Sequence, residues 1–347
     1  MKLQWENTLL KLSDPIKKAI LKLNKTSLHM VLIVDAQKRL LGTLTDGDVR
    51  RAFLKGIKLD EPVSKIMCNQ PTTMRYTESR EAIFKVMKEN GYSGIPIVDE
   101  DNKVCDLVSL YGVNNQNNQK IPVLLLAGGF GRRLHPLTAS CPKPMLKIGG
   151  VPILERIIKR FSDNGFKDIY VSVHYHADQI KDYFEDGSSL GVNIKYIDEQ
   201  VPLGTAGSLS LLPTNIGENI IVMNGDILTS VNLKALLEFH QASNAYATMT
   251  LREHIYTNPF GVVNFDKDRL ISIKEKPVIS NFVSAGIYII NNQAINSLNK
   301  NEYTDMPNFL MSIVDKGHEV KTFPIHERWL DVGRQSDFQL AQEEYQL

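Results

Sequence analysis

The feature that most restricts the fold of this chain is an internal repeat in its first third. The run Ile33-Val34-Asp35 returns as Ile97-Val98-Asp99, and the apolar and hydroxyl positions that follow it recur at the same offset. Each copy reads as a helix, an apolar strand, a polar turn and a second strand, with helices expected over Pro15–Asn24 and Ser79–Asn90. One copy is too short to bury much surface, so the two are expected to pack together as one α/β domain.

A polar segment separates this repeat from the rest of the chain. Residues 114–119 are six uncharged Asn and Gln side chains without an apolar anchor, which is typical of a linker. We therefore expect a first domain at 1–113, a linker at 114–120 and a second domain at 121–347.

The second domain alternates short apolar strands with amphipathic helices. This alternation predicts a Rossmann-like, doubly wound α/β fold, in which a mostly parallel sheet carries helices on both faces. Ligands of such sheets bind at the carboxyl ends of the strands, so chemistry is expected just after Ala127 and Met223. The predicted strands are Ile121–Ala127, Ile169–Val173 and Ile220–Met223, and the predicted helices are Ile153–Asn164, Asp178–Phe184 and Leu233–Asn244.

The residues after the first of these strands carry the strongest chemical signal. Three glycines within residues 128–131 let backbone N–H groups turn toward a polyphosphate, because no Cβ interferes. Arg132, Arg133 and Lys143 add cations that suit a triphosphate and its pyrophosphate leaving group. The alternative is a Gly-rich turn with surface arginines. A dinucleotide fingerprint fails because Leu134 stands where a small residue is required, and no Walker A sequence follows.

Two acidic residues end short apolar runs far apart in the sequence. Asp226 follows a strand and a glycine, and Asp331 ends the run that begins at Trp329. Brought together beside a triphosphate, they would form a Mg²⁺ site, because Mg²⁺ prefers a few carboxylates with phosphate and water oxygens. The alternative for either residue alone is a turn or helix-cap aspartate.

These motifs, in this order, resemble a known family. Leu126–Met145 resembles the signature of the sugar-1-phosphate nucleotidyltransferases, and the likeness extends over some two thirds of the chain. Residues 1–113 resemble a tandem pair of CBS modules, marked by Thr45-Asp-Gly-Asp48 and Gly91-Tyr-x-x-x-Pro-Ile-Val-Asp99. A CBS pair ahead of a nucleotidyltransferase resembles the guanylyltransferases of the legionaminic acid pathway, which activate glucosamine 1-phosphate. The further family motifs are Glu199-x-x-Pro-Leu-Gly-Thr-Ala-Gly207, Asn224-Gly-Asp226, Glu275-Lys-Pro277, Ser284-Ala-Gly-Ile-Tyr288 and Trp329-Leu-Asp-Val-Gly333.

The resemblance implies an Mg²⁺-dependent enzyme that transfers a nucleotidyl group from an NTP to a sugar 1-phosphate. It places Arg133 at the leaving pyrophosphate and Lys143 at the transferring phosphoryl group. Asp226 and Asp331 are the implied catalytic metal ligands. The implied nucleotide contacts are Leu126, Ala127, Gly128, Gly129, Gly131, Arg132, Glu199, Gly204, Thr205, Asn224 and Gly225. The implied sugar-phosphate contacts are Glu275, Lys276, Ser284 and Gly286, of which Lys276 orients the attacking phosphate.

Two positions depart from the family pattern, and the substrates are only partly defined. Arg132 stands where threonine is common, and Ser284 stands where asparagine is common, so their contacts differ from the family's. GTP and glucosamine 1-phosphate are the first expectation, and Leu203–Gly207 looks slightly more like guanylyltransferases. The alternatives are guanylyl transfer to mannose 1-phosphate and uridylyl or thymidylyl transfer to glucose 1-phosphate. An inactive nucleotide or sugar sensor is the alternative from another class, and the retained aspartates and Lys143 argue against it.

The CBS pair predicts an asymmetric regulatory site. The resemblance implies that Thr45 and Asp48 bind the ribose hydroxyls of an adenine nucleotide in the first copy. The aligned residues of the second copy are Ser109 and Gly112, so the carboxylate is missing there. We expect at most one such nucleotide per chain. The alternative is that the pair only mediates dimer packing.

Composition excludes several other classes of protein. A formal net charge of +1 argues against a protein that coats nucleic acid or anionic membranes. No apolar run approaches the roughly 18 residues of a membrane span, and the N-terminus lacks a signal-peptide pattern. Three widely spaced cysteines favour reduced thiols, and His174 with His176 lacks a third ligand, which favours a surface or crevice-rim role over a metal site. We expect a cytoplasmic homo-oligomer without nucleic-acid or membrane partners.

Overall fold

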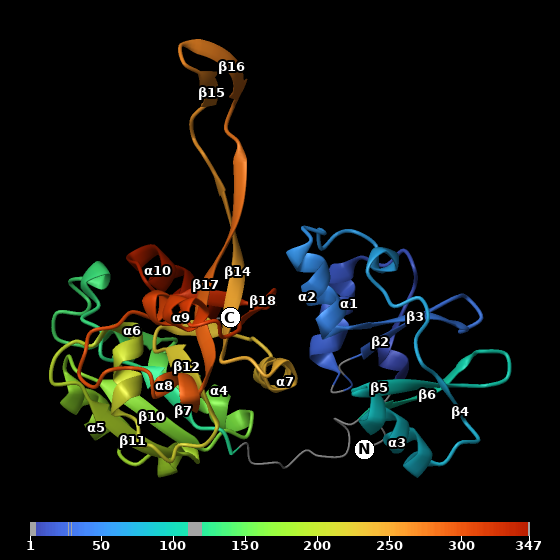
Figure 1. Cartoon of the computed structure of the whole chain (residues 1–347), viewed down its shortest axis with the longest axis horizontal. Coiled ribbons are helices and arrows are strands. Elements are labelled where there is room, and N and C mark those ends of the chain that lie inside the picture. The colour runs from blue at the N-terminus through green and yellow to red at the C-terminus, as the bar shows by residue number, and fades with distance from the viewer. Residues whose placement is uncertain (1–4, 27, 29, 110–119, 346–347) are drawn as a thin grey trace. The chain divides into compact units, whose positions relative to one another are not determined.

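The computed structural model describes residues 5–26, 28, 30–109 and 120–345, and the chain divides into two compact units, Met1–Asn117 and Asn118–Leu347 (Figure 1). Gly112 and all but the last residue of the expected linker lie outside the described residues. None of the helices in the described part is long and apolar enough to cross a membrane.

The first unit contains two copies of one small α/β element. In each copy the first two strands of a three-stranded sheet are parallel and the last two are antiparallel. Both sheets shift register at the same place, after Ile33 and after Ile97. The first copy comprises η1 (Trp5–Thr8), β1 (Leu9–Leu10), α1 (Ile16–Lys25), β2 (Met30–Val34), β3 (Leu40–Thr45) and α2 (Asp46–Leu54). After η2 (Val63–Lys65), the second comprises β4 (Met74–Arg75), α3 (Arg80–Asn90), β5 (Gly94–Val98) and β6 (Val104–Ser109).

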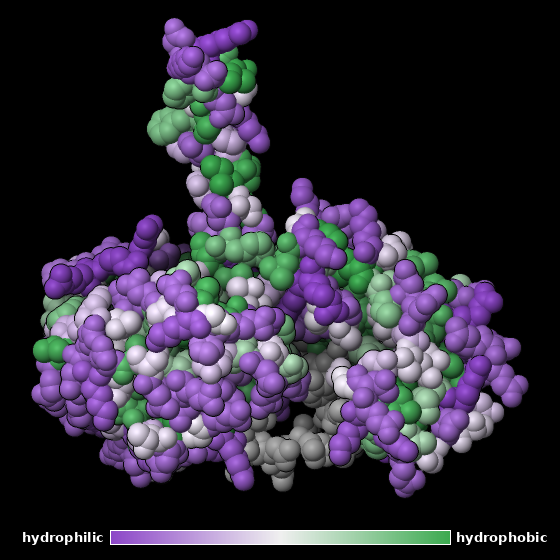
Figure 2. Space-filling view, viewed as in Figure 1, coloured by the Kyte–Doolittle hydropathy of each residue, from purple (hydrophilic) through white to green (hydrophobic). Residues whose placement is uncertain are grey.

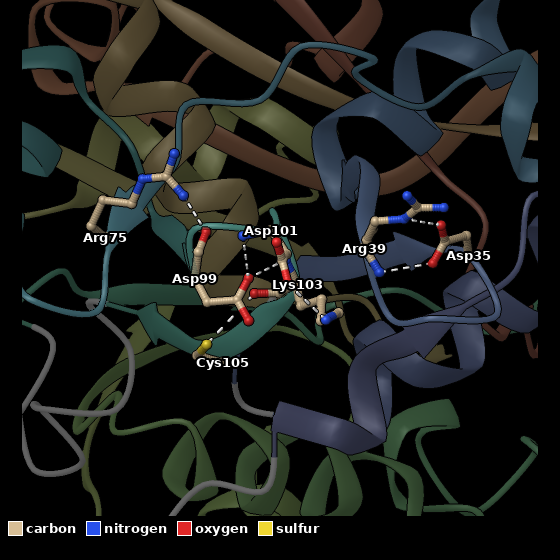
Figure 3. A network of polar contacts seen from close by, with 7 residues as sticks. All are labelled: Asp35, Arg39, Arg75, Asp99, Asp101, Lys103 and Cys105. Carbon is tan, nitrogen blue, oxygen red and sulfur yellow. Dashed lines mark hydrogen bonds and ion pairs between the residues drawn. The ribbon is translucent and has the colours of Figure 1, made fainter.

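Matching turns join the last two strands of each copy (Figure 3). The carboxylate of Asp35 accepts a hydrogen bond from the backbone N–H of Arg39 at 2.9 Å. Asp99 accepts the equivalent bond from the N–H of Lys103 at 2.8 Å, and its backbone carbonyl accepts one from Arg75. Because each aspartate accepts a hydrogen bond from the backbone of its own turn, the same Ile-Val-Asp run produces the same turn in both copies.

The two turns also bond to each other reciprocally. The N–H of Leu40 donates to the carbonyl of Asn102 at 2.9 Å, and the N–H of Val104 donates to the carbonyl of Lys38 at 3.0 Å. Leu40 corresponds to Val104, and Lys38 corresponds to Asn102, in the alignment of the two repeats. Equivalent residues therefore make equivalent hydrogen bonds, as expected when an approximate two-fold axis relates the copies. The predicted tandem repeat is thereby confirmed.

The second unit is built on a seven-stranded sheet in the order β11-β10-β7-β12-β17-β14-β18. Four neighbouring pairs are parallel, and β17 runs antiparallel to both of its neighbours. The mostly parallel sheet is confirmed, whereas the antiparallel strand inside it was not predicted. The strands are β7 (Val123–Leu126), β10 (Asp168–Val173), β11 (Asn193–Asp198), β12 (Asn219–Asn224), β14 (Ala247–Thr257), β17 (Val278–Asn291) and β18 (Val320–Ile325).

Helices cover both faces of this sheet, and the side chains of each strand alternate between them. On β7, Val123 and Leu125 pack into one apolar layer and Leu124 packs into the other. The first layer includes α4 (Ile153–Asp163), α5 (Ala177–Phe184), α7 (Leu233–Ser243) and α10 (Gln335–Tyr345). The second layer includes α6 (Gly204–Gly207), α8 (Asn292–Ile295) and α9 (Met306–Asp315). The doubly wound arrangement expected from the sequence is therefore present.

The strand order reverses beside β7. From β7 the chain moves outward to β10 and β11, and it then returns to place β12 on the other side of β7. Leu126 and Asn224 are register partners at the carboxyl ends of β7 and β12. The ligand-binding edge predicted after Ala127 and Met223 lies at this reversal, where such sheets bind ligands.

A buried histidine ties α7 to the sheet. His240 is 2% exposed, and its ring nitrogens contact Thr248 Oγ1 on β14 and Asn219 Oδ1 on β12, both at 2.9 Å. Burial lowers the pKa of His240 to about 4, so the ring stays neutral in the folded protein.

This histidine predicts a loss of stability in acid. The unfolded chain takes up a proton on the ring near pH 6.5, whereas the folded chain does so only near its lowered pKa. The free energy of unfolding is therefore expected to fall by about 1–3 kcal/mol as the pH drops through this window. Thermal unfolding followed by circular dichroism should depend less on pH for His240→Gln than for the wild type. His254→Gln, at an exposed position, should match the wild type; equal pH dependence in His240→Gln would contradict the assignment.

β14 and β17 continue beyond the sheet as a two-stranded ribbon. β18 pairs with β14 only as far as Arg252, whereas β17 stays paired to the end of β14. The hairpin of β15 (Val262–Asp266) and β16 (Arg269–Lys274) lies at the far end, away from the body of the second unit (Figure 1). We call residues 253–283 the arm.

Candidate active site

Two short strands bring the distant aspartates together. β13 (Ile227–Thr229) pairs antiparallel with β19 (Trp329–Asp331), so Asp331 lies opposite the residue that follows Asp226. The N–H of Val332 donates to the carbonyl of Asp226 at 3.0 Å and extends this pairing. The structure therefore places both acidic residues predicted to bind metal beside the carboxyl end of β12.

Lys143 lies between the two carboxylates. It belongs to η5 (Lys143–Met145), its side chain is 10% exposed, and its Nζ forms an ion pair with Asp226 Oδ2. The same Nζ lies 3.9 Å from Asp331 Oδ1. A glycine at position 131 is needed for this placement, because it has φ +63° and a Cβ there would lie 3.1 Å from Lys143 Cβ. The Gly-rich loop and the base of the Lys143 side chain are thus packed directly against each other.

The two arginines of the loop differ in their surroundings. Arg133, on η4 (Arg132–Leu134), has its guanidinium near Gly333, where a Cβ would lie 3.4 Å from it. Arg132 instead lies over the ring of Phe130, 5.3 Å from its centre. Burial and the charge of Asp226 raise the pKa of Asp331, while Lys143 and Arg133 oppose the shift. Arg133 is therefore the arginine that belongs to the acidic cluster.

Three buried oxygens of this cluster have no hydrogen-bond partner among the described residues. They are Asn224 Oδ1, Asp226 Oδ1 and Asp331 Oδ1. A buried carboxylate oxygen without a partner is costly unless a ligand satisfies it. Hard oxygen donors of this kind are those that Mg²⁺ prefers. The residues present thus fit the Mg²⁺ that the family resemblance implies.

The two central strand ends are held close together by a glycine. The N–H of Gly225 donates to the carbonyl of Leu126 at 2.9 Å, and a Cβ on Gly225 would lie 2.7 Å from that oxygen. Gly286, with φ +70°, lies against the side chain at the end of β12, since a Cβ there would lie 2.8 Å from Asn224 Nδ2. Only small residues allow the backbone to approach this closely.

Glu199 closes the neighbouring loop instead of standing free. Its carboxylate accepts hydrogen bonds from the N–H of Leu203 at 3.0 Å and from the hydroxyl of Ser172. A Cβ on Gly128 would lie 3.3 Å from Glu199 Oε1, so this carboxylate also flanks the Gly-rich loop. The structure therefore brings Glu199 to the predicted nucleotide side of the crevice with both carboxylate oxygens already engaged.

The segment 203–207, which includes the short helix α6, is held to the start of α9 by hydrogen bonds. The hydroxyl of Thr205 accepts a hydrogen bond from the N–H of Met306 at 2.7 Å, and the N–H of Ala206 donates to the carbonyl of Thr304 at 2.9 Å. Gly204 has φ +76°, and a Cβ there would lie 2.6 Å from the same carbonyl. Asp305 Oδ1 accepts from the Thr205 N–H at 3.3 Å. Sequence reasoning missed Thr304 and Asp305, although an acidic residue just before a helix with proline in its first turn is a recognisable start signal.

An aromatic rim borders the Gly-rich loop. His174 Nδ1 contacts the carbonyl of Glu199 at 2.8 Å, and its ring meets that of Phe130 edge-on at 5.6 Å. The hydroxyl of Tyr175 donates to the carbonyl of Ala139 at 3.1 Å. His174 therefore lies at the rim predicted for it, and Phe130, which no motif singled out, joins it there.

Two predicted sugar-phosphate residues lie outside the crevice of their own chain. Glu275 and Lys276 are exposed on the turn between β16 and β17, and Lys276 has a positive φ of 42°. Ten residues of largely extended chain separate Lys276 from Gly286, which is about 33 Å at about 3.3 Å per residue. Ser284, at the base of the arm, hydrogen-bonds Tyr288 through its hydroxyl at 2.8 Å. The structure thus brings Gly286 to the site and does not bring Glu275 or Lys276.

The residues expected to bind a regulatory nucleotide form the start of α2. The Thr45 hydroxyl and N–H both donate to Asp48 Oδ2, at 2.7 and 2.8 Å. The N–H of Asp48 donates back to Thr45 Oγ1 at 3.4 Å, and Asp48 also pairs with Arg51. The pair is therefore a capping box, and a nucleotide would have to share these groups with the helix.

Comparison with known proteins agrees with this geometry. Residues 122–346 match the family model described as nucleotidyl transferase, and residues 8–55 and 63–113 match the CBS domain. The chain belongs to the nucleotidyl transferase family. The family predicted from the motifs, the CBS pair and the fold class are thereby confirmed.

The relatives of this chain include guanylyltransferases. A mannose-1-phosphate guanyltransferase of Pichia angusta is 33% identical over 227 residues, covering 62% of this chain and 61% of that protein. The mannose-1-phosphate guanylyltransferase of Mycobacterium tuberculosis is 30% identical over 225 residues, covering 63% of each. The chain thus spans less than two thirds of the length of these curated relatives. The crystal structure of HddC from Yersinia pseudotuberculosis, also solved in complex with GMP-PN, superposes with a TM-score of 0.52 at 27% identity, over 65% of this chain and 99% of that one.

Proposed function

We propose that this chain transfers a guanylyl group from GTP to glucosamine 1-phosphate, releasing pyrophosphate and a nucleoside-diphosphate sugar. The observation that carries the proposal is the cluster in which the buried Lys143 lies between Asp226 and Asp331 beside the Gly-rich loop. The family and the guanylyltransferases among the relatives support nucleotidyl transfer from GTP. The acceptor rests on the order of the domains, with a CBS pair ahead of the transferase unit.

The reaction depends on positioning and charge neutralisation. A sugar phosphate is ionised at neutral pH, so its oxygen attacks the α-phosphorus in line without a general base, and pyrophosphate leaves. The backbone of residues 128–131 holds the triphosphate, Lys143 lies at the transferring phosphoryl group, and Arg133 neutralises the pyrophosphate. Mg²⁺ held by Asp226 and Asp331 supplies further neutralisation of the phosphate oxygens when it is bound.

A substrate panel tests this proposal. Pyrophosphate release is measured for the four NTPs with the 1-phosphates of glucosamine, glucose and mannose, and kcat/KM is expected to be highest for GTP with glucosamine 1-phosphate. Mannose 1-phosphate is the second candidate acceptor, because the guanylyltransferases among the relatives are named for it. Release with no pair would contradict the enzyme assignment and favour an inactive sensor. Preference for UTP or dTTP would reject the guanylyl donor.

The two loop arginines should differ in their effect on turnover. Arg133→Ala is expected to lower kcat by at least about tenfold, because a charge-assisted contact to the leaving group is lost. Arg132→Thr restores the common family residue and removes only a stacking contact with Phe130, so kcat should change less than about threefold. Steady-state pyrophosphate release measures both. Loss of turnover in Arg132→Thr with full turnover in Arg133→Ala would reverse the two assignments.

The regulatory unit is expected to bind at most one adenine nucleotide per chain. Calorimetric titration of the full chain with AMP tests this, and Asp48→Ala should weaken binding by about tenfold to a hundredfold as a buried polar partner is lost. Ser109→Ala, at the aligned position of the second copy, serves as the control and should bind as the wild type. Two sites of similar affinity, or a site that persists in Asp48→Ala, would contradict the asymmetry. Absence of heat would favour a packing role.

A further inference from the structure

The arm exposes far more apolar surface than a free surface loop requires. Eleven large hydrophobic side chains between Ile255 and Val283 are exposed, among them Phe260 at 74% and Phe265 at 70%. Figure 2 shows hydrophobic patches along the visible face of the arm, between polar ones. At on the order of 100 Å² for each such side chain, the arm exposes roughly 1,000 Å² of apolar surface. The largest apolar patch of a typical monomer is about 300–600 Å².

The register of the arm gathers these side chains into defined faces. In the tip hairpin, Val263 lies opposite Ile273 and Phe265 lies opposite Leu270, so one face of the ribbon is continuously apolar. Asn264 pairs with Ser272 on the opposite face, where their side chains hydrogen-bond at 3.2 Å. The hairpin is thus amphipathic, as a strand pair is when its apolar face packs against another layer.

No described residue of the second unit supplies that layer. β14 pairs with β18 only before the arm begins, and the apolar core clusters of the unit contain no residue of the arm. A two-stranded hairpin alone is only marginally stable in water. The partner that covers the apolar face of the arm therefore has to be available whenever the chain folds. A second copy of the same chain meets this requirement, because it is made in equal amount.

Area and charge agree with a second copy as the occupant. Two arms packed face to face would cover about half of their combined apolar surface, roughly 1,000 Å². Because interfaces are about 60% apolar, this corresponds to roughly 1,700 Å² in total, within the 1,200–2,000 Å² that stable interfaces bury. Residues 258–278 carry four basic and three acidic side chains, so two arms do not repel each other. The turn at the tip, Asp266-Lys267-Asp268-Arg269, alternates in sign and is complementary to its own copy in a two-fold contact.

We propose that the arm is the interface between two copies of this chain and that it carries Lys276 to the catalytic crevice of the other copy. Lys276 is exposed on the arm, about ten residues of largely extended chain away from Gly286 at its own site. Docking on a second copy would bring its ammonium to a sugar phosphate there. The role of Lys276 rests on the proposed function, whereas the pairing of the arms does not.

Sedimentation velocity of the full chain tests the pairing without any activity measurement. The wild type is expected to be a dimer at micromolar concentration, and Phe265→Ser with Leu270→Ser should be monomeric with an unchanged far-UV spectrum. Met311→Ser with Val314→Ser, exposed at 55% and 45% on α9, is the matched control and should remain dimeric. A monomeric wild type, or a dimer that the arm variant leaves intact, would overturn the proposal.

A mixed dimer tests the transfer of Lys276. Chains carrying Lys276→Ala and chains carrying Asp226→Asn are co-expressed with different affinity tags, and the dimer holding both is purified. If Lys276 acts on the other copy, one of its two sites has both residues, so about half of the wild-type activity returns. A mixed dimer no more active than the Lys276→Ala homodimer would overturn the exchange. An inactive wild type with intact dimers would refute the proposed function and leave the interface standing.

Discussion

Asp331→Asn is expected to lower kcat by at least about 100-fold without lowering the melting temperature. The carboxylate is one of two that each have a buried oxygen without a hydrogen bond, and loss of a charge-stabilising group of this kind costs about two to three orders of magnitude in turnover. The pKa of Asp331 is raised in the folded state, so its charge opposes folding at neutral pH, and removing that charge leaves stability equal or higher. Pyrophosphate release at saturating Mg²⁺ and differential scanning fluorimetry measure the two effects.

The companion change Asp226→Asn separates catalysis from stability. It should lower kcat to a similar extent, but it also removes the counter-charge of the buried Lys143, so the melting temperature should fall. Asp198→Asn, in an exposed pair with Lys181, is the control and should alter neither quantity. Near-wild-type turnover in either Asp226→Asn or Asp331→Asn would remove that residue from the mechanism.

Lys143→Met should depress both turnover and stability. In the proposed mechanism the ammonium contacts the phosphoryl group whose charge changes in the transition state, so kcat is expected to fall by at least about 100-fold. Without it, Asp226 and Asp331 face each other with no buried cation between them, and unfolding should become easier by on the order of 2–3 kcal/mol.

A double variant distinguishes these two effects of Lys143. Lys143→Met with Asp226→Asn removes one charge of each sign, so it should regain most of the lost melting temperature and none of the lost kcat. Lys147→Met, at an exposed position nearby, should behave as the wild type. Recovery of turnover in the double variant would show that the lysine only balances the aspartates.

Much of the fold could be predicted because its signals are local. The strand expected at Ile169–Val173 is β10 (Asp168–Val173), and the helix expected at Ile153–Asn164 is α4 (Ile153–Asp163). Apolar residues at strand or helix spacing produce such patterns within a dozen residues. The antiparallel β17 could not be predicted in this way, because its direction depends on pairing with β12 and β14 far away in the sequence.

The place of the candidate site at the strand ends could be predicted from local patterns, whereas the meeting of its two aspartates could be predicted only through the family resemblance. Nothing in the sequence around Asp226 or Asp331 reveals that β13 and β19 pair, since three-residue strands carry no periodicity. The engagement of Thr205 by Met306 depends likewise on a contact about a hundred positions away. The roles assigned to individual site residues stay predictions, which the variants above test.

The family resemblance implies that residues 203–207, which include α6, contact the donor nucleotide, and under this prediction their attachment to α9 affects how base preference can change. A recognition surface that is fastened by hydrogen bonds before a nucleotide arrives loses little entropy on binding, but it adapts poorly to a different base. Because Thr304 and Asp305 hold the loop, its shape is set partly by a segment that no family motif marks. Base preference can therefore drift during evolution through substitutions at the start of a helix, while every signature residue of the crevice stays the same.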